Sequence, residues 1–571
     1  MKKQPTSDTS RPLSPAAVQM LRAATAAHQA GEFARAKALY RSVLKIDPKQ
    51  SSVLLMLGIL HAQRGNYSDA EQLLRNALKL NPDNADGQFN YGNVLLGLQR
   101  LDEAFAAFGK ALLLNPAFAE AQLNRGSILM LRKRFQEAVT CFDAVIRINP
   151  TYAQAYCNRG HALEEMKSFD DALASYNTAL IYDPQNAEFH ANRANILHGM
   201  RRYDEALRSI SMALSLRPDY ATFHYNYGNM LFELRRYDDA SAAFNKALAL
   251  DPDLAIAHYN EGFSRLLLGD TERGWKKYEY RWELPERLGA KRNFPQPVWL
   301  GDSLINGKTI LIHAEQGFGD TLMACRYVPL VAALGARVVL EVQPALVRLM
   351  EGLEGISTLI AQGEVLPQFD VHCPIMSLPL AFRTRLETIP TKIPYLKIPK
   401  EHVDHWRSKL GDNGFKIGIA WAGNATFKKD SDRSITLKNI LPICSIQEAR
   451  YFSIQKDLRD GDAGILSANP QITHLGNELN DFLDTAAAMM SLDLIISSDT
   501  SIVNLAGALG RPVWILLSFN PDWRWLLDRA DSPWYPTARL FRQRKSGDWS
   551  PVVDEARAGL EELLLVQAVG R

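Results

Sequence analysis

The hydrophobic pattern of the first half of the chain repeats with a period of 34 residues, as from Pro48 to Pro82. Each unit keeps a proline, an alanine and a small residue, and several keep an aromatic four residues after the alanine. Small residues let two helices cross closely, and proline ends a helix. The pattern predicts a tandem array of helix pairs. Its recurring positions are Pro48, Pro82, Pro116, Pro150, Pro184, Pro218 and Pro252; Ala36, Ala70, Ala104, Ala138, Ala172, Ala206 and Ala240; Gly58, Gly92, Gly126, Gly160, Ala194, Gly228 and Gly262; and Phe108, Phe142, Tyr176 and Phe244.

This pattern resembles the tetratricopeptide repeat, in which stacked helix pairs form a solenoid. The resemblance covers about residues 17–284, with clear units followed by a weaker last one. We therefore expect an α-solenoid over residues 17–284, preceded by a disordered stretch at residues 1–16. Arrays of this kind bind partners along one face, so a partner protein or polypeptide is expected.

Asparagine recurs with the same period, at the sixth position of the predicted first helices. A side-chain amide carries both a donor and an acceptor, so a ladder of amides can pair with an extended peptide backbone. The alternative is that these amides tie neighbouring helices together. The predicted acceptor peptide groove is formed by Asn90, Asn124, Asn158, Asn192, Asn226 and Asn260.

The last unit contains an aromatic cluster around Trp275, Tyr278 and Trp282. A terminal repeat must cover its open face, so the cluster is expected to cap the solenoid and join it to the next domain. An aromatic platform for a sugar or an acceptor is the alternative.

From about residue 307 the pattern changes to short β-branched runs alternating with helical segments. This alternation predicts two Rossmann-like lobes with parallel sheets, at residues 307–398 and 399–571, after a linker at residues 285–306. The first lobe is short for a complete Rossmann-like lobe. The expected strands are residues 309–313, 337–342 and 369–372 in the first lobe, and 416–421, 451–455, 494–497 and 513–517 in the second.

Composition narrows the functional classes. The 65 basic and 63 acidic residues nearly balance, which argues against a nucleic-acid partner. The five cysteines show no CxxC spacing, so neither a zinc site nor a disulfide framework is expected. With neither a secretory signal nor a long apolar run, we expect a cytoplasmic protein without a transmembrane segment.

Two strand-to-helix turns carry candidate chemistry. In the second lobe, Asp499, Thr500 and Ser501 follow an apolar strand and open an apolar helix. The N-terminus of such a helix suits an anion, and the turn lies at the carboxyl edge of the sheet, where ligands bind. In the first lobe, Gly319 and Asp320 follow the first strand in the same way. The alternative for both turns is an ordinary helix cap.

Three further polar residues follow strands of the second lobe. Gln455 and Lys456 lie at the carboxyl end of a strand and are expected to point toward Asp499. Arg433 lies in a polar loop after the strand at 416–421, and a solvated surface position is the default interpretation for Lys428 and Lys429 of the same loop.

The segment from Trp275 to about Trp549 resembles bacterial tetratricopeptide glycosyltransferases. The matching stretches include HAEQGFGDTL, IAWAGN, SSDTSIVNLAGALGRPVW and PDWRWL. The catalytic half is similar to the heptosyltransferases of lipopolysaccharide synthesis. The layout resembles that of the O-linked N-acetylglucosamine transferases, with repeats before a two-lobed GT-B fold.

The resemblance implies inverting, metal-independent transfer from a nucleotide-diphosphate sugar, which is a co-substrate and not a cofactor. It places the general base at Asp320, with Gly319 beside it. The predicted donor site consists of Gly319, Arg433, Gln455, Lys456, Asp499, Thr500, Ser501 and Asn504, the last where heptosyltransferases usually have histidine.

Three functions are compatible with these features. The first is a glycosyltransferase acting on a polypeptide held by the repeats. The second keeps the transfer reaction but uses a cell-surface glycan or a lipid-linked saccharide as acceptor. The third is a scaffold whose lobes are inactive. The sugar, the nucleotide base and the oligomeric state are not specified by the sequence.

Overall fold

The computed structural model describes residues 14–284, 291–426 and 430–569. They divide into two compact units, with the boundary between Asp219 and Tyr220. Most of the tail predicted to be disordered lies outside the described residues. The prediction is wrong for residues 15 and 16, because Pro15 and Ala16 begin the first helix, which Ser14 caps.

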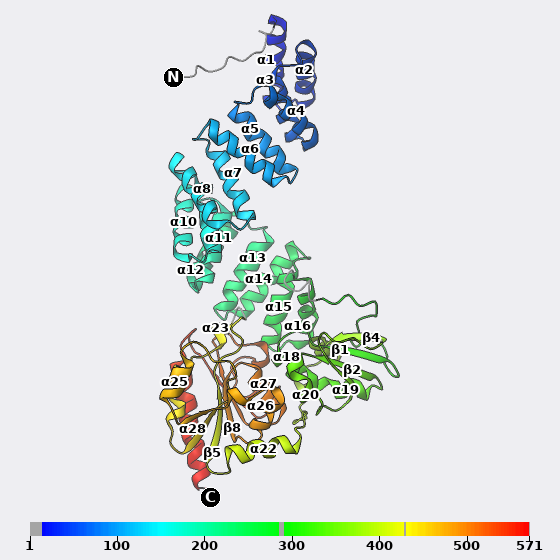
Figure 1. Cartoon of the computed structure of the whole chain (residues 1–571), viewed down its shortest axis with the longest axis vertical. Coiled ribbons are helices and arrows are strands. Elements are labelled where there is room, and N and C mark those ends of the chain that lie inside the picture. Colours follow the sequence, from blue (N-terminus) through cyan, green and yellow to red (C-terminus); the bar gives the residue numbers. More distant parts are fainter. Residues whose placement is uncertain (1–13, 285–290, 427–429, 570–571) are drawn as a thin grey trace. The chain divides into compact units, whose positions relative to one another are not determined.

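The first unit consists of helix pairs, as the period predicted (Figure 1). The two helices of each pair pack against one another and against the next pair. The helices are α1 (Pro15–Gln29), α2 (Phe33–Ile46), α3 (Ser51–Gln63), α4 (Tyr67–Leu80), α5 (Ala85–Gly97), α6 (Leu101–Leu114), α7 (Ala119–Leu131), α8 (Phe135–Ile148), α9 (Ala153–Glu165), α10 (Phe169–Tyr182), α11 (Ala187–Gly199) and α12 (Tyr203–Leu216).

The recurring glycine and the recurring aromatic residue contact one another in the pairs that carry both, at Gly92, Gly126, Gly160 and Gly228. A Cβ placed on Gly126 of α7 would lie 2.5 Å from Cε1 of Phe142 in α8. The same arrangement joins Gly92 to the ring of Phe108. Only glycine leaves room for the ring at this crossing, which explains why the two residue types recur together.

The second unit begins with two more helix pairs. These are α13 (Ala221–Glu233) with α14 (Tyr237–Leu250), and α15 (Ala255–Leu267) with α16 (Thr271–Tyr278), followed by the 3₁₀ turn η1 (Glu279–Glu283). Trp275 of α16 is buried and shares a hydrophobic core with residues of both following sheets. The aromatic cluster therefore joins the last repeat to the α/β region, as expected, and is not an exposed platform.

The first sheet has four parallel strands in the order β3-β2-β1-β4. They are β1 (Thr309–His313), β2 (Arg337–Val342), β3 (Ile356–Ala361) and β4 (Val371–Pro374). The first two have the predicted bounds, and β4 begins two residues later than predicted. Strand β3 was missed because it is a half-exposed edge strand without a continuous apolar run. The helices α18 (Phe318–Ala324), α19 (Val328–Ala333), α20 (Val347–Met350) and α21 (Leu378–Ala381) accompany this sheet.

The predicted linker contributes to this sheet. Residues 285–290 lie outside the described residues, but Val298 forms a parallel bridge with His372, and Trp299 donates its N–H to the His372 carbonyl at 2.7 Å. Residues 291–306 therefore pack on the first sheet, which differs from the prediction of a separate linker.

The second sheet has six parallel strands in the order β10-β9-β8-β5-β6-β7. The strands β7 and β10 were not predicted, since β7 has only three residues and β10 alternates with arginine. The strands are β5 (Phe415–Ala420), β6 (Ala449–Ser453), β7 (Ile472–His474), β8 (Leu494–Ser498), β9 (Val513–Leu517) and β10 (Ala538–Arg542). The helices are α22 (Lys400–Leu410), α23 (Asp430–Arg433), α24 (Leu437–Ile440), α25 (Asp462–Ala468), α26 (Phe482–Met489), α27 (Ser501–Ala508) and α28 (Ser550–Val569).

The region after the repeats is thus an α/β structure with two parallel sheets, as predicted. Among the described residues, no helix is both long enough and apolar enough to cross a bilayer.

Candidate functional site

The strand order of each sheet marks where a ligand can bind. In sequence order, the strands of the second sheet run 3-2-1-4-5-6, the order of doubly wound dinucleotide-binding folds. The order reverses between β5 and β8, and ligands bind in the crevice at the carboxyl ends of the strands flanking this point. The residues after these strands are Trp421 and Asp499, and Ser498 donates its hydroxyl to the Trp421 carbonyl at 2.9 Å.

The first sheet reverses between β1 and β4 in the same way. The loop after β1 leads directly into α18, which carries Gly319 and Asp320. Both candidate turns named from the sequence therefore lie at the reversal points of their sheets.

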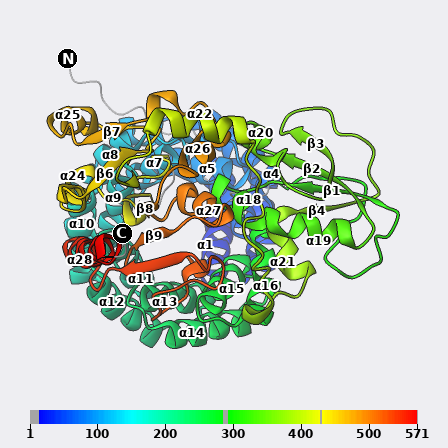
Figure 2. The same cartoon turned by 90° about the horizontal axis from the view of Figure 1, so that it is seen from below.

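The two turns meet. A Cβ placed on Gly319 would lie 2.9 Å from Nδ2 of Asn504 and 3.6 Å from Cα of Ser501. The helices α18 and α27 are accordingly adjacent, and Figure 2 shows them side by side between the two sheets. Glycine at 319 permits this approach, because a side chain there would strike the Asn504 amide.

Asp320, the predicted general base, is held by two donors. Its Oδ1 forms an ion pair with Nη2 of Arg524, and its Oδ2 accepts a hydrogen bond from the N–H of Gly317 at 2.9 Å. Its side chain is 21% exposed, so it lies at the mouth of the site. To take a proton from an acceptor, this carboxylate would have to exchange one of the two contacts.

Arg524 is a central residue that no sequence motif singled out. It also pairs with Asp522 at 2.7 Å, its side chain is 8% exposed, and it lies over the Trp523 ring. Burial by itself would lower the pKa of Arg524, but Asp522 and Asp320 raise it above its usual value. The only local signal was an arginine between two tryptophans in PDWRWL, and nothing in that pattern identifies Asp320 as its partner.

Asp499 lies at the end of β8 and is partly buried. Burial raises the pKa of Asp499 to about 6, and the nearby Asp522 carboxylate acts in the same direction. Trp525, Arg433 and Arg524 oppose this shift. A carboxyl group whose pKa lies this close to neutrality can exchange protons under ordinary conditions.

Thr500 and Ser501 start α27. Thr500 is the N-cap, and its hydroxyl accepts the N–H of Ile502 at 3.3 Å. Its side chain is buried, whereas Ser501 in the first turn is partly exposed. The helix cap that was the alternative for this turn is therefore present, and it leaves Ser501 at the surface of the crevice.

Gln455 was predicted to point into the crevice, but its amide is bound to backbone groups instead. Its amide oxygen accepts the N–H groups of Trp421 and Ala422, and its amide nitrogen donates to the carbonyls of Ala422 and Asp457. All four hydrogen-bonding positions of the amide are thus occupied by backbone. Gln455 holds the loop after β5 in place, and a ligand would have to displace these bonds to reach it.

Asn504 is also occupied. It is buried, donates to the Thr500 carbonyl at 3.2 Å, and accepts the hydroxyl of Tyr535 at 3.0 Å. With Gly319 against its nitrogen, it supports the α18–α27 contact, in contrast to the predicted contact with the donor.

The two predicted basic residues are placed differently. Lys456 is exposed and donates from Nζ to the Asn480 carbonyl at 2.6 Å. Arg433 lies against Gly423, after β5, and pairs with Asp430 at 3.5 Å. Arg433 therefore lies beside the loop after β5, and its charge acts to lower the pKa of Asp499.

A buried polar network supports the Asp320 loop. Arg281 of η1 is fully buried and pairs with Glu279 at 2.6 Å and with Glu315 at 3.1 Å. Burial raises the pKa of Glu315 to about 7, although Arg281 acts to lower it. Neither residue was predicted, and together they connect the end of the last repeat to the loop after β1.

The asparagines of the repeats are half-buried, and several bond to a neighbouring helix. Asn124 donates to Asn93 at 2.8 Å, and Asn260 donates to Asn229 at 2.9 Å. Asn192 lies 3.4 Å from the Cys157 sulfur, whereas Asn90 and Asn158 bond within their own helices. At three positions the structure therefore supports the alternative that these amides tie helices together.

Comparison with known proteins identifies the repeats. Four tetratricopeptide repeat models match, at residues 27–88 and 62–104, 92–153 and 199–255, 153–186, and 175–208. The chain is 26% identical over 325 residues to the protein FlbA of Caulobacter vibrioides, which covers 52% of this chain and 53% of that protein. The chain thus spans about half the length of this curated relative.

Three solved structures each resemble part of the chain. The crystal structure of MamA is 25% identical, covers 29% of this chain and 96% of its own, and has a TM-score of 0.28. YrrB, described as a TPR protein with an unusual peptide-binding site, is 22% identical over 33% of this chain and 97% of its own, with a TM-score of 0.29. A tetratricopeptide repeat protein from Parabacteroides merdae covers 44% of this chain and 99% of its own at 16% identity, with a TM-score of 0.37. The amino-terminal part of the chain, over residues 27–255, is built of tetratricopeptide repeats.

Proposed function

We propose that the chain is a glycosyltransferase that moves a sugar from a nucleotide-diphosphate donor to a hydroxyl group of a polypeptide bound by the repeats. The two α/β lobes would act as a GT-B type pair, with the donor between them. Transfer would be inverting and independent of a metal ion.

The observation that carries this proposal is the meeting of the two reversal points. The turns at the reversal points of the two parallel sheets lie next to one another, where Gly319 of one lobe lies against Asn504 and Ser501 of the other. A donor held at the second lobe would thereby be presented to the loop of the first lobe.

The donor diphosphate is assigned to the first turn of α27. The backbone N–H groups and the positive dipole end of this helix favour an anion, and the partly exposed Ser501 lies beside them. Arg433 of α23 lies against Gly423 in the loop after β5 and would supply a guanidinium from the other side of the reversal point. These groups would stabilise the nucleoside diphosphate as the bond from the anomeric carbon to its oxygen breaks.

The proton acceptor is assigned to one of two carboxylates. Asp320 is the residue expected from the resemblance, but both of its oxygens already accept hydrogen bonds. Asp499 has a pKa of about 6, close to the range in which a general base works. The observations favour Asp499 as the base, with Asp320 positioning Arg524 at the mouth of the site.

A scaffold function is the second candidate. The repeats are of a kind that binds other proteins, and the Arg524–Asp320 pair could serve only to hold the lobes together. This candidate predicts partner binding without any affinity for nucleotides.

The test uses the full chain and a panel of UDP, GDP, ADP and CDP in calorimetry. Binding of at least one nucleotide supports the transferase, and binding of none contradicts it. Once the binding nucleotide is identified, release of that nucleoside diphosphate from its nucleotide sugar would be measured for Asp320→Asn and Asp499→Asn. The base is the residue whose loss removes transfer by about 10²-fold or more while nucleotide affinity is retained.

The acceptor would be found by comparing intact masses of the host's proteins with and without the chain. A mass difference equal to one sugar on a polypeptide supports the proposed acceptor. A change confined to glycans or lipid-linked saccharides would favour the cell-surface alternative.

A further inference from the structure

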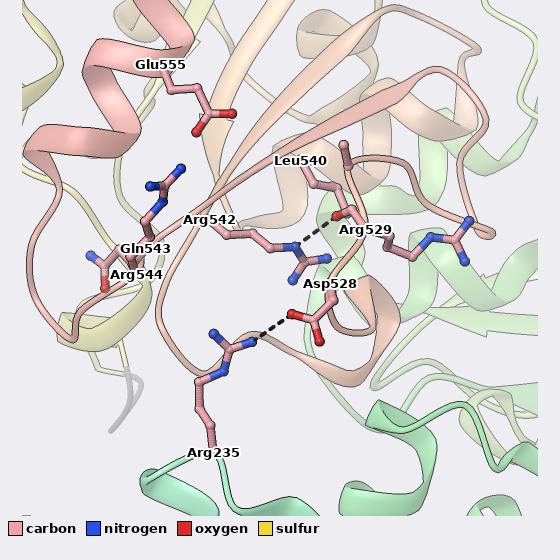
Figure 3. A pocket seen from close by; sticks show the side chains of 9 residues that line it. Arg235, Asp528, Arg529, Leu540, Arg542, Gln543, Arg544 and Glu555 are labelled. Atoms are coloured by element: carbon pink, nitrogen blue, oxygen red, sulfur yellow. Dashed lines mark hydrogen bonds and ion pairs between the residues drawn. The ribbon is translucent and has the colours of Figure 1, made fainter.

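A cavity of about 390 Å³ lies at the carboxyl edge of the second sheet, at its edge strand β10. It is separate from the Thr500 turn and is lined by arginines from distant parts of the chain (Figure 3). Arg235 comes from the turn between α13 and α14, and Arg542 and Arg544 come from the end of β10. Figure 3 shows the guanidinium groups of Arg235 and Arg542 turned toward one another, with Arg544 extending toward Glu555 at another side of the cavity.

The positive charge of this cavity is only partly neutralised. Arg235 lies 3.6 Å from Asp528, whose side chain is 89% exposed. Arg544 is exposed and has no hydrogen bond or ion pair among the residues that the structure describes. The remaining acid of the lining is Glu555, so three guanidinium groups face two carboxylates. Arg529 does not add to this excess, because it pairs with Asp531 at 2.6 Å.

Arg542 adds a partly buried donor. It donates to the carbonyls of Arg529, Leu526 and Trp525 at 3.0, 3.0 and 2.5 Å. A guanidinium has five N–H groups, so two remain available. Burial and the nearby Arg235 lower the pKa of Arg542 to about 10, although Asp528 acts to raise it.

We propose that this cavity binds an acidic side chain of the polypeptide that the repeats hold. Guanidinium groups bind carboxylates through paired N–H donors, and an incoming carboxylate would balance the excess charge of the arginines. A polypeptide source is favoured because Arg235 belongs to a repeat, so one wall of the cavity is part of the repeat array. This inference deepens the proposed function and rests on its polypeptide acceptor.

The cavity is connected to the candidate active site through one segment. The carbonyls that Arg542 binds belong to residues 525–529, which directly follow Arg524. Leu526 and Asp528 in this segment have positive φ angles of 50° and 49°, a conformation that needs support from neighbours. An acidic group in the cavity would therefore bind close to the segment that positions Arg524 against Asp320.

The experiment is calorimetry on the full chain with two peptides of about four repeats, Gly-Glu and Gly-Gln, at about 50 mM and 300 mM salt. We expect the Gly-Glu peptide to bind at low salt and the Gly-Gln peptide not to bind. Arg544→Gln and Arg235→Gln should each weaken binding by about threefold to tenfold. Arg557→Gln is the matched control, since Arg557 lies on α28, pairs with Glu561 at 3.1 Å and with no other carboxylate of the described residues, and does not line the cavity.

Several results would overturn the inference. Equal binding of the two peptides would show that the acidic group is not recognised. Equal effects of Arg544→Gln and Arg557→Gln would show that the peptide does not bind in the cavity. Displacement of the peptide by an equal concentration of orthophosphate would indicate a site for a small free anion instead. Peptide binding needs no nucleotide, so its failure is distinct from failure of the proposed transfer. Thermal unfolding of each variant would verify its fold. Arg544→Gln is the variant least expected to affect folding, because Arg544 bonds to nothing among the described residues.

Discussion

At the scale of single residues, the candidate site is dominated by carboxylates that share few cations. Arg524 serves both Asp320 and Asp522, and Asp499 lies near enough to both Asp522 and Arg524 to respond to their charges. A buried carboxyl without its own cation destabilises the fold in its charged form. Such a residue is more readily explained by a functional requirement than by stability.

Asp499→Asn is expected to stabilise the protein at pH 7. The pKa of Asp499 is about 6 in the folded state against 3.8 for the ordinary side chain. A raised carboxyl pKa means that the folded state binds the proton more tightly, so folding loses stability as the pH rises from about 4 to about 6. Asparagine mimics the protonated group, and we expect a gain of about 1–2 kcal/mol, reduced from the full shift because the side chain is partly exposed.

Urea unfolding followed by tryptophan fluorescence would measure this gain. The difference between Asp499→Asn and the natural sequence should disappear below about pH 4, where both side chains are neutral. A variant that is less stable than the natural protein at pH 7 would show that Asp499 makes a stabilising contact when charged.

At the scale of elements, the repeats depend on close helix crossings. Phe142 of α8 lies over Gly126 of α7, and the ring occupies the space that a side chain at 126 would need. Gly109, in the middle of α6, differs, because a Cβ placed on it would have no neighbouring atom within 4 Å. The two glycines therefore separate packing from helix propensity.

Gly126→Ala is expected to destabilise the first unit by about 1–2 kcal/mol. Displacing the Phe142 ring costs about 1–3 kcal/mol, which exceeds the gain in helix propensity of about 0.5–1 kcal/mol. Gly109→Ala should give that gain without the cost. Thermal unfolding by circular dichroism would compare the two variants, and equal effects would refute the packing role of Gly126.

The asparagine ladder can be divided in the same way. Asn124→Ala removes a bond between helices and should lower stability by about 1 kcal/mol. Among the described residues, the side chain of Asn158 bonds to Gln154 of its own helix and to no other helix, so Asn158→Ala should leave stability nearly unchanged. Loss of polypeptide binding in Asn158→Ala without loss of stability, measured by calorimetry and thermal unfolding, would support a peptide groove. Unchanged binding would favour the purely structural interpretation.

At the scale of the whole molecule, the last two repeats belong to the α/β region. Leu266 and Trp275 share one core with residues of both sheets, and the Trp275 ring lies 5.0 Å from the Trp523 ring. The nitrogen of Trp275 donates to the Thr384 carbonyl at 3.1 Å. The repeats therefore end near residue 284 in the sequence, whereas the boundary between the two compact units comes earlier, after Asp219.

A fragment of residues 220–571 is expected to fold, whereas a fragment of residues 291–571 is not. The shorter fragment exposes the surface that Trp275 covers, and losing one buried tryptophan costs about 3–5 kcal/mol. Gel filtration and circular dichroism would distinguish a compact protein from an aggregated one. A monomeric, cooperatively unfolding 291–571 fragment would show that the repeats are dispensable for this core.

The sequence by itself determined the repeats, because their contacts recur at a fixed spacing and each helix pair is a local structure. Most strands of the two sheets were also readable, since a buried parallel strand is a continuous apolar run. The half-exposed β3, the short β7 and the arginine-bearing β10 lack that run and were missed.

Only the tertiary structure decided which polar residues act together. Arg524 and Asp320 are 204 residues apart, and no local pattern links them. Gln455 and Asn504 carry the residue types of a binding site, but folding places backbone groups around Gln455 and a neighbouring helix against Asn504. The physical reason is that hydrogen-bond partners in a sheet crevice are set by strand order, which brings distant loops to one edge. Residue type specifies what a side chain can bind, and the fold determines whether that capacity remains available.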